Sequence, residues 1–171
     1  NNIIYENQEI AVSVLHGQGA ILENNTLYHD GATAIAISAG SRGVGLRNNV
    51  FDVLDGVALS VANDSHLEFA SDFNLYHIRG IGAVAQWQGG LRRTLNSWQN
   101  TAFLDQNSLT QDPHYVAVPG PDGVVGFVDP MHDGRDDDFH LKSRFGAARG
   151  SGRAPTLTIA TGLPQFPGTA F

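Results

Sequence analysis

Short runs of alternating apolar and small or polar residues fill the N-terminal part of the chain. Val12–Val14, Ile35–Ile37 and Leu59–Val61 each place a small residue between two larger aliphatic ones. This period of two is typical of a β-strand that buries one face. Gly, Asn, Asp and Ser stand between the runs and favour tight turns. The pattern therefore predicts short strands joined by turns.

The same pattern recurs at a fixed spacing. The apolar positions Val12, Ile35 and Leu59 are 23 and 24 residues apart. Two further columns share this period: the asparagine pairs beginning at Asn1, Asn24 and Asn48, with a weaker copy at Ser71–Leu75, and the set Leu22, Leu46 and Phe69. Three columns with one period indicate an internal repeat.

The length of the repeat selects the architecture. Three short strands and three turns fit in 23–24 residues, whereas a helical repeat of the TPR kind needs about 34 residues and a propeller blade about 40. A leucine-rich repeat would fit by length, but its spaced leucines are absent. We therefore expect an all-β solenoid, a parallel β-helix in which each repeat is one coil and coils stack about 4.8 Å apart. Residues 1–98 suffice for about four regular coils.

The repeated asparagines have a structural explanation. Asparagine tolerates the left-handed conformation that a tight corner requires. Stacked side-chain amides also bond to one another along the axis and so satisfy polar groups that face inward. We therefore expect Asn24, Asn25, Asn48 and Asn49 to form a structural ladder.

The chain divides into three parts by composition and period. Residues 1–98 hold the regular coils, and residues 99–146 lose the period and are expected to finish the solenoid. Residues 147–171 are rich in Gly, Pro and Thr and are expected to form a tail or linker.

The two ends of the solenoid are expected to differ. Leu95–Gln99 predicts a short helix or turn, with Trp98 closing the C-terminal end, and Val124–Val128 and Asp138–Leu141 predict two more strands. The sequence opens inside the repeat without a capping segment. Because an open end exposes unpaired backbone groups, we expect preceding β-helix turns or a capping chain to cover Asn1–Glu9.

Composition removes several classes of function. The chain carries 10 basic and 17 acidic residues, a net charge of −7, and no basic cluster beyond Arg92–Arg93, which argues against nucleic-acid binding. No apolar run approaches the roughly 20 residues of a membrane span. The chain has no Cys, which excludes disulfides, thiolate nucleophiles and cysteine-bound zinc.

One strand face is predicted to be flat and uncharged. The residues that flank the inward pairs are Ala11, Ala34, Ala58, Ser13, Ala36 and Ser60. Small side chains permit close approach of a second layer, so this face favours packing or self-association. A bed for sugar rings is the alternative, although aromatic side chains would be expected there.

Charged residues are expected to gather at one corner. Asp30, Asp55 and Arg79 each precede a glycine at successive coils, and His77 lies nearby. Stacked carboxylates with an arginine could bind a cation or a uronic acid, or raise one aspartate pKa for acid catalysis. Asp-Gly is also a common turn dipeptide, and this structural interpretation is favoured.

Two further sets of candidates remain. The densest acidic segment carries Asp129, Asp133, Asp136 and Asp138, whose oxygens suit Ca²⁺. It does not follow the EF-hand pattern, and a solvated loop is favoured, so no cofactor is expected beyond this Ca²⁺ candidate. Trp87 and Trp98 are candidates for stacking on sugars.

Several segments resemble a known superfamily. The asparagine columns, Ser71–Tyr76 followed by Trp98-Gln99, Asp112-Pro113 and Asp138–Ser143 resemble the right-handed parallel β-helix proteins of the pectate-lyase-like superfamily. The resemblance covers residues 1–146 and is closest to the C-terminal portion of such proteins, as found in large bacterial secreted or surface proteins. It implies a right-handed coil and an extracellular or cell-surface location.

The resemblance leaves more than one function open, because fold does not determine activity. We expect a non-catalytic module of a larger bacterial protein, serving as a structural scaffold, an adhesin-like stalk or a carbohydrate-contacting surface. The alternative is the C-terminal part of a polysaccharide-degrading enzyme, a uronate lyase or glycoside hydrolase, whose site lies on turns outside this sequence. A fibre-like self-assembly is a third interpretation.

Overall fold

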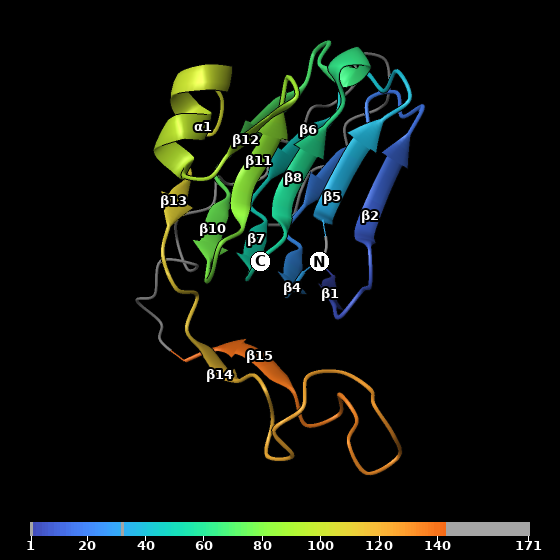
Figure 1. The fold of residues 1–171 in the computed structure, drawn as a ribbon, viewed down its shortest axis with the longest axis vertical. Helices are drawn as coiled ribbons and strands as arrows, with labels where there is room; N and C mark the ends of the chain where they lie inside the picture. The colour runs from blue at the N-terminus through green and yellow to red at the C-terminus, as the bar shows by residue number, and fades with distance from the viewer. Residues whose placement is uncertain (1, 32, 143–171) are drawn as a thin grey trace, which may run out of the picture.

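The chain folds into a solenoid of about four coils, built from three sheets of stacked strands (Figure 1). The structure is a computed structural model and describes residues 2–31 and 33–142 of the 171. The first sheet contains β1 (Ile3–Tyr5), β4 (Thr26–His29), β7 (Val50–Val53), β10 (Leu75–Ile78) and β13 (Leu109–Thr110). The second contains β2 (Ile10–Leu15), β5 (Thr33–Ser38), β8 (Val57–Val61), β11 (Ala83–Trp87) and β12 (Gly90–Arg92). The third contains β3 (Ile21–Glu23), β6 (Gly45–Arg47) and β9 (Ala70–Asp72).

The strands pair in parallel with their equivalents one coil away, as the repeat predicts. Val12 lies opposite Ile35, and Ile35 lies opposite Leu59. A short 3-10 helix, η1 (Asn63–Ser65), follows β8. Because each coil buries its apolar residues only against its neighbours, stability is shared along the axis.

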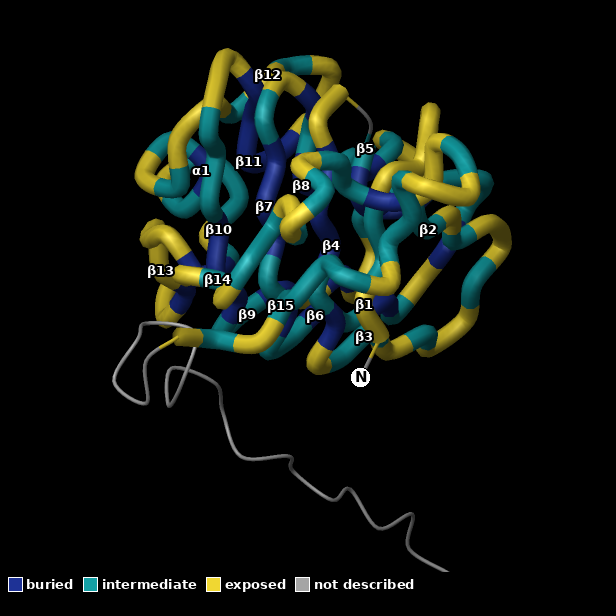
Figure 2. Tube along the Cα trace, turned by 90° about the horizontal axis from the view of Figure 1, so that it is seen from below, coloured by how far each residue is buried: buried dark blue, intermediate teal, exposed yellow. Residues whose placement is uncertain are grey.

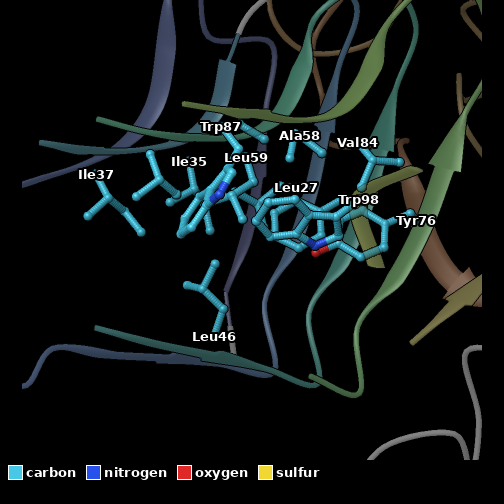
Figure 3. Packing of buried hydrophobic residues seen from close by; sticks show 14 of the residues in the cluster. Leu27, Ile35, Ile37, Leu46, Ala58, Leu59, Tyr76, Val84, Trp87 and Trp98 are labelled. Atoms are coloured by element: carbon cyan, nitrogen blue, oxygen red, sulfur yellow. The ribbon is translucent and has the colours of Figure 1, made fainter. Parts of the chain in front are cut away.

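Apolar columns fill the space enclosed by the three sheets (Figure 3). Leu27, Phe51 and Tyr76 stand in register in the first sheet and are fully buried. The rings of Phe51 and Tyr76 are nearly parallel, at 6° and 5.0 Å between centroids. Burial of such rings is a large part of the hydrophobic stabilisation of a solenoid.

The asparagine ladder is present, and the two residues of each pair divide its tasks. The second residue forms the ladder: the side chain of Asn25 donates to Asn49 Oδ1 at 3.0 Å, and that of Asn49 donates to Asn74 Oδ1 at 3.2 Å. The first residue turns the corner, since Asn24 and Asn48 have φ of 58° and 56°. The expected ladder therefore runs through Asn25 and Asn49, whereas Asn24 and Asn48 turn the corner.

Two columns differ from the expected alignment by a shift in register. The fourth asparagine is Asn74, 25 residues after Asn49 rather than 23, so the fourth copy begins at Phe73 and not at Ser71. Leu46 lies opposite Ser71, whereas the buried Phe69 lies two residues earlier in the chain. The coils are therefore unequal in length, which a fixed period cannot anticipate.

The predicted flat face is narrower than expected. Ala34 and Ala58 have no exposed surface and belong to the core with Ala11, so the alternation breaks where the second-sheet strands begin. Figure 3 shows Ala58 among the core side chains. Only the column Ser13, Ala36, Ser60 and Gln86 carries the outward pattern. Self-association through this face stays a prediction.

The C-terminal end of the coiled region is covered. β12 folds back antiparallel on β11, and α1 (Leu95–Ala102) follows, which confirms the expected short helix. Thr94 caps this helix by accepting a hydrogen bond from the amide of Ser97 at 3.1 Å. Trp98 is fully buried and meets Trp87 edge-on at 5.3 Å, so it fills the end of the core as predicted.

The opposite end of the solenoid remains open among the described residues. β1, β2 and β3 each pair with a strand on one side only. A pocket of about 250 Å³ enters the interior there, lined by inward-facing residues that include Val12, Leu22 and Leu27.

A hairpin packs on the outer face of the first sheet. β14 (Tyr115–Ala117) and β15 (Asp138–Leu141) pair antiparallel and lie below the coils in Figure 1. The ring of Phe139 lies 5.0 Å from that of Tyr5 and 5.6 Å from that of Tyr28. Seen from below in Figure 2, the hairpin crosses in front of the first-sheet strands.

The expected strand at Val124–Val128 is wrong, whereas that at Asp138–Leu141 is confirmed as β15. The loop between the hairpin strands is held by carboxylates instead. Asp137 accepts hydrogen bonds from the amides of Gly120 at 3.1 Å and Gly126 at 2.8 Å, which removes these donors from any ladder. The tail expected at residues 147–171 lies outside the described residues. No helix in the described part of the chain is long and apolar enough to cross a membrane.

Candidate functional site

A charged cluster occupies the outer face of the first sheet, beside the hairpin. Tyr28, Asp52 and His77 follow one another in a single outward-facing column on β4, β7 and β10. Arg79 follows β10 immediately, at the start of the loop to the second sheet. The stacking of coils therefore brings together side chains about 25 residues apart in the sequence.

Asp52 is the centre of this cluster. Its side chain is 3% exposed. One carboxylate oxygen accepts a hydrogen bond from Arg79 Nε at 2.5 Å, and the other lies 3.1 Å from His77 Nδ1. Arg79 also donates from Nη2 to Asp30 at 2.8 Å and lies over the ring of Tyr28 at 4.4 Å. These contacts form one network across three coils.

Three of the four residues proposed for catalysis from the sequence, Asp30, His77 and Arg79, meet here. Asp55 does not. The amide of Arg79 bonds to the carbonyl of Val53 at 2.7 Å, which places Arg79 beside Leu54 instead of Asp55. The carboxylate of Asp55 accepts from the amide of Ile81 at 3.0 Å, as a turn residue.

Sequence reasoning missed Asp52, the best-buried carboxylate of the cluster. Its column holds tyrosine in the two preceding coils, at Tyr5 and Tyr28, and Asp52 breaks that pattern. A charged residue that replaces an aromatic one within a regular column was the available signal.

The electrostatics of the network favour its charged form. Burial acts to lower the pKa of Arg79, but the hydrogen bond to Asp30 and the charge of Asp52 raise it above its ordinary value. Burial raises the pKa of Tyr28, and the positive charge of Arg79 opposes this in part. Arg79 therefore remains a cation with two anionic partners.

A pocket of about 220 Å³ lies between this cluster and the hairpin. We call it the hairpin pocket. Its lining includes Asp52, His77, Arg79, His114, Tyr115 and Lys142. Coils and hairpin both contribute, so docking of the hairpin creates the pocket.

Tyr115 brings an unused hydroxyl to this pocket. The hydroxyl oxygen is buried and has no hydrogen-bond partner among the described residues. Burial, followed by the negative charge of Asp52, raises the pKa of Tyr115 far above its ordinary value of 10.0. The group is therefore a neutral phenol and a hydrogen-bond donor at physiological pH.

The paired His77 and Asp52 have a geometry suited to proton transfer. A carboxylate on Nδ1 fixes the tautomer and orientation of an imidazole and leaves Nε2 for a ligand. In this network, however, the carboxylate is shared with Arg79, which holds it in place as a structural anion.

The tryptophans proposed for sugar binding lie in the core. Trp98 is fully buried and donates from Nε1 to Asp105 at 2.8 Å, and Trp87 is 8% exposed. Neither ring can stack on a sugar without unpacking the end of the solenoid. Among the described residues, the most exposed aromatic residue is Phe103, at 81%, just after α1.

Phe103 borders a groove over the third sheet. The groove has a volume of about 340 Å³ and is lined by Ile21, Ala70 and Phe103, with Arg47, Asp72 and Gln106 as polar groups. We call it the third-sheet groove. Its mixture of an exposed ring and polar side chains is typical of a ligand-binding surface.

The acidic loop directs its carboxylates to separate partners. Asp129 lies 3.0 Å from His132, Asp133 pairs with Arg135, and Asp138 lies 2.6 Å from His140. Asp136 accepts from the amide of Asp122 at 3.1 Å. Within residues 2–31 and 33–142, no three acidic or histidine side chains gather around a common centre. Ca²⁺ binding at this loop stays a prediction.

Comparison with protein-family models, with curated proteins and with solved structures finds no match to this chain.

Proposed function

We propose that the chain is a non-catalytic β-solenoid module that acts as a rigid scaffold within a larger extracellular protein of bacterial origin. The carrying observation is the regular stack, in which parallel strands stay in register from coil to coil and an asparagine ladder runs along the axis. At the N-terminal rim, β1, β2 and β3 each present an unpaired edge around inward-facing apolar residues. The resemblance to pectate-lyase-like β-helices supports the extracellular bacterial setting.

The rim has the chemistry of a stacking surface. Parallel edges offer backbone donors and acceptors to a strand of the same register. Val12 and Leu22 are only partly buried, whereas Ile35 and Leu46, one coil further on, are buried. A further coil would bury Val12 and Leu22 in the same way. The C-terminal end is already covered by α1 and β12. The arrangement therefore supports the addition of a coil at the N-terminal rim only.

The charged cluster is consistent with a scaffold, because its ion pairs link neighbouring coils. Arg79 bonds to residues of two other coils, Asp30 and Asp52, and its charge is matched there. A catalytic arginine or aspartate would instead be directed at a substrate. This arrangement supports a structural role for the network.

Adding one coil tests the scaffold proposal. A copy of residues 24–47 placed directly before Asn1 continues the register, as Arg47 precedes Asn48. We expect one cooperative unfolding transition, raised by about 5–10 °C, because one added coil contributes a few kcal/mol. The control is the same copy with the equivalents of Leu27, Ile35 and Leu46 changed to Ser. An equal melting temperature for the extended and original chains would contradict the proposal.

A second candidate function is contact with a carbohydrate through the third-sheet groove. Phe103 is the specific observation in favour, because exposed aromatic rings stack on sugar faces while polar neighbours bond the hydroxyls. Phe103→Ala should abolish retardation in affinity electrophoresis against plant and bacterial polysaccharides. Phe127→Ala, which removes another exposed ring, is the matched control. Equal retardation of both variants would reject the groove.

An activity assay distinguishes the enzymatic alternative from the scaffold proposal. Incubation of the chain, and of the longer protein that contains it, with polyuronates should release no unsaturated products, which absorb in the ultraviolet. Product formed by this chain and lost in His77→Gln would replace the scaffold proposal with a lyase.

A further inference from the structure

We propose that the hairpin pocket is a binding site for a small carboxylate, held between the coils and the hairpin. The inference is independent of the scaffold role. It begins from hydrogen-bond donors that are left without acceptors. Arg79 uses Nε for Asp52 and Nη2 for Asp30, which leaves Nη1 facing no acceptor among the described residues.

Two more donors line the same pocket. The Tyr115 hydroxyl is buried and unpartnered, and a buried hydroxyl without a partner destabilises the folded state. The Lys142 ammonium forms no ion pair within the described part of the chain, while its amide anchors to the carbonyl of His114 at 2.9 Å. Arg79 from the coils, with Tyr115 and Lys142 from the hairpin, therefore line one small pocket.

The carboxylates of the pocket already have partners. Asp52 bonds through one oxygen to Arg79 and through the other to His77. Asp112 accepts from the amide of His114 at 2.7 Å and has the His114 ring 3.4 Å away. A ligand that satisfies the free donors must therefore supply oxygen acceptors.

The nearby carboxylates disfavour a ligand with more than one negative charge. At neutral pH the cations Arg79 and Lys142 face the anions Asp52 and Asp112, with Asp30 beyond. A dianion such as phosphate would meet nearby carboxylates of like charge, which disfavours it. A carboxylate carries one negative charge, and its two oxygens can accept hydrogen bonds from guanidinium, hydroxyl and ammonium groups.

The volume limits the size of the ligand. A space of about 220 Å³ corresponds to roughly seven water molecules at about 30 Å³ each. It suits a carboxylate with a few attached atoms, or the acidic end of a larger saccharide that extends to solvent. The bound group would bridge Arg79 on the coils to Tyr115 and Lys142 on the hairpin.

Titration calorimetry and thermal unfolding of the whole chain test this proposal, with sodium acetate and sodium glucuronate as probes at constant ionic strength. Glucose and sodium chloride are the neutral and salt controls. We expect saturable binding and a rise in melting temperature with glucuronate, because a ligand that binds only the folded state stabilises it. An equal response to acetate would assign recognition to the carboxylate alone, and a response to glucuronate only would assign it to an acidic sugar.

Variants locate the site. Tyr115→Phe and Lys142→Gln should each weaken binding about tenfold, the loss of one hydrogen bond to a charged group. Tyr5→Phe makes the same change under the same hairpin but outside the pocket, and should bind normally. Tyr115→Phe should not lower the melting temperature without ligand, because it removes an unpartnered hydroxyl. Equal shifts with glucose or chloride, or unchanged affinity in both pocket variants, would overturn the proposal.

Discussion

At the scale of single residues, identical side chains have different structural roles according to their position in the coil. Asn49 is buried and bonds to both neighbouring coils, whereas Asn24 is exposed and turns the corner at φ 58°. The sequence shows both as members of one repeated pair. Their separate roles depend on which amide points along the axis.

Asn49→Ala should destabilise the protein strongly. Asn49 accepts from the amide and side chain of Asn25, and its own side chain donates to the carbonyl of Leu22 at 3.0 Å. Its loss leaves several buried polar groups unpaired, which costs about 3 kcal/mol. Urea denaturation measures this cost. Asn24→Gly, at a left-handed position where glycine is unstrained, should change the free energy of unfolding by less than about 1 kcal/mol; equal costs would contradict this division of roles.

His29 should make the protein sensitive to mild acid. The residue is fully buried in register with Val53, and burial lowers its pKa below the ordinary value of 6.5, offset in part by the backbone of Asn7 and the charge of Asp30. The unfolded chain therefore binds a proton first as pH falls. The stabilisation is complete above about pH 6.5 and is lost as the pH drops through the lower folded pKa.

Replacing this side chain isolates its effect. His29→Leu resembles the aliphatic neighbours Val53 and Ile78 in the column. Urea denaturation at pH 7.5 and pH 5.0 should show a smaller loss of stability in His29→Leu than in the original protein. The same loss in both would assign the acid sensitivity to other groups.

At the scale of elements, the hairpin shows how local pattern and tertiary contact differ. The alternation of Asp138–Leu141 predicts β15 correctly, but nothing nearby identifies Tyr115–Ala117 as its partner. Docking on the first sheet rests on four aromatic rings, those of Tyr5, Tyr28, Tyr115 and Phe139. These rings come from four separate strands, β1, β4, β14 and β15.

Phe139→Ala should release the hairpin without unfolding the coils. The half-buried ring contacts Tyr5, Tyr28 and Tyr115, and its removal should cost about 2 kcal/mol of docking, less than a fully buried phenylalanine. Hydrogen exchange should then accelerate in β14 and β15 but not in β5 and β8. Phe127→Ala, at a ring that is 72% exposed, is the control. Uniform acceleration through the molecule would show that hairpin and coils unfold together.

At the scale of the whole molecule, stability should behave as a sum over stacked coils. Deleting residues 25–48 removes one complete coil and joins Asn24 to Asn49, so the register is kept. The shortened chain should remain folded, with a free energy of unfolding lower by about 2–4 kcal/mol, one coil's share of a typical total. Deleting residues 25–36 removes half a coil and should abolish the cooperative transition. Circular dichroism with thermal unfolding measures both; two folded products would contradict the stacked arrangement.

The sequence by itself determined the solenoid, because stacked parallel strands place like residues at one fixed period and that period can be counted along the chain. Only the tertiary structure decided the candidate site. Successive asparagines of the ladder are 23, 24 and 25 residues apart, and this drift moves Arg79 from Asp55 to the carboxylates of Asp30 and Asp52. A shift of one residue hardly alters an apolar column, since large aliphatic and aromatic side chains replace one another there. It changes completely which charged atoms come within bonding distance, and the hairpin that encloses them is positioned by contacts with the finished coils.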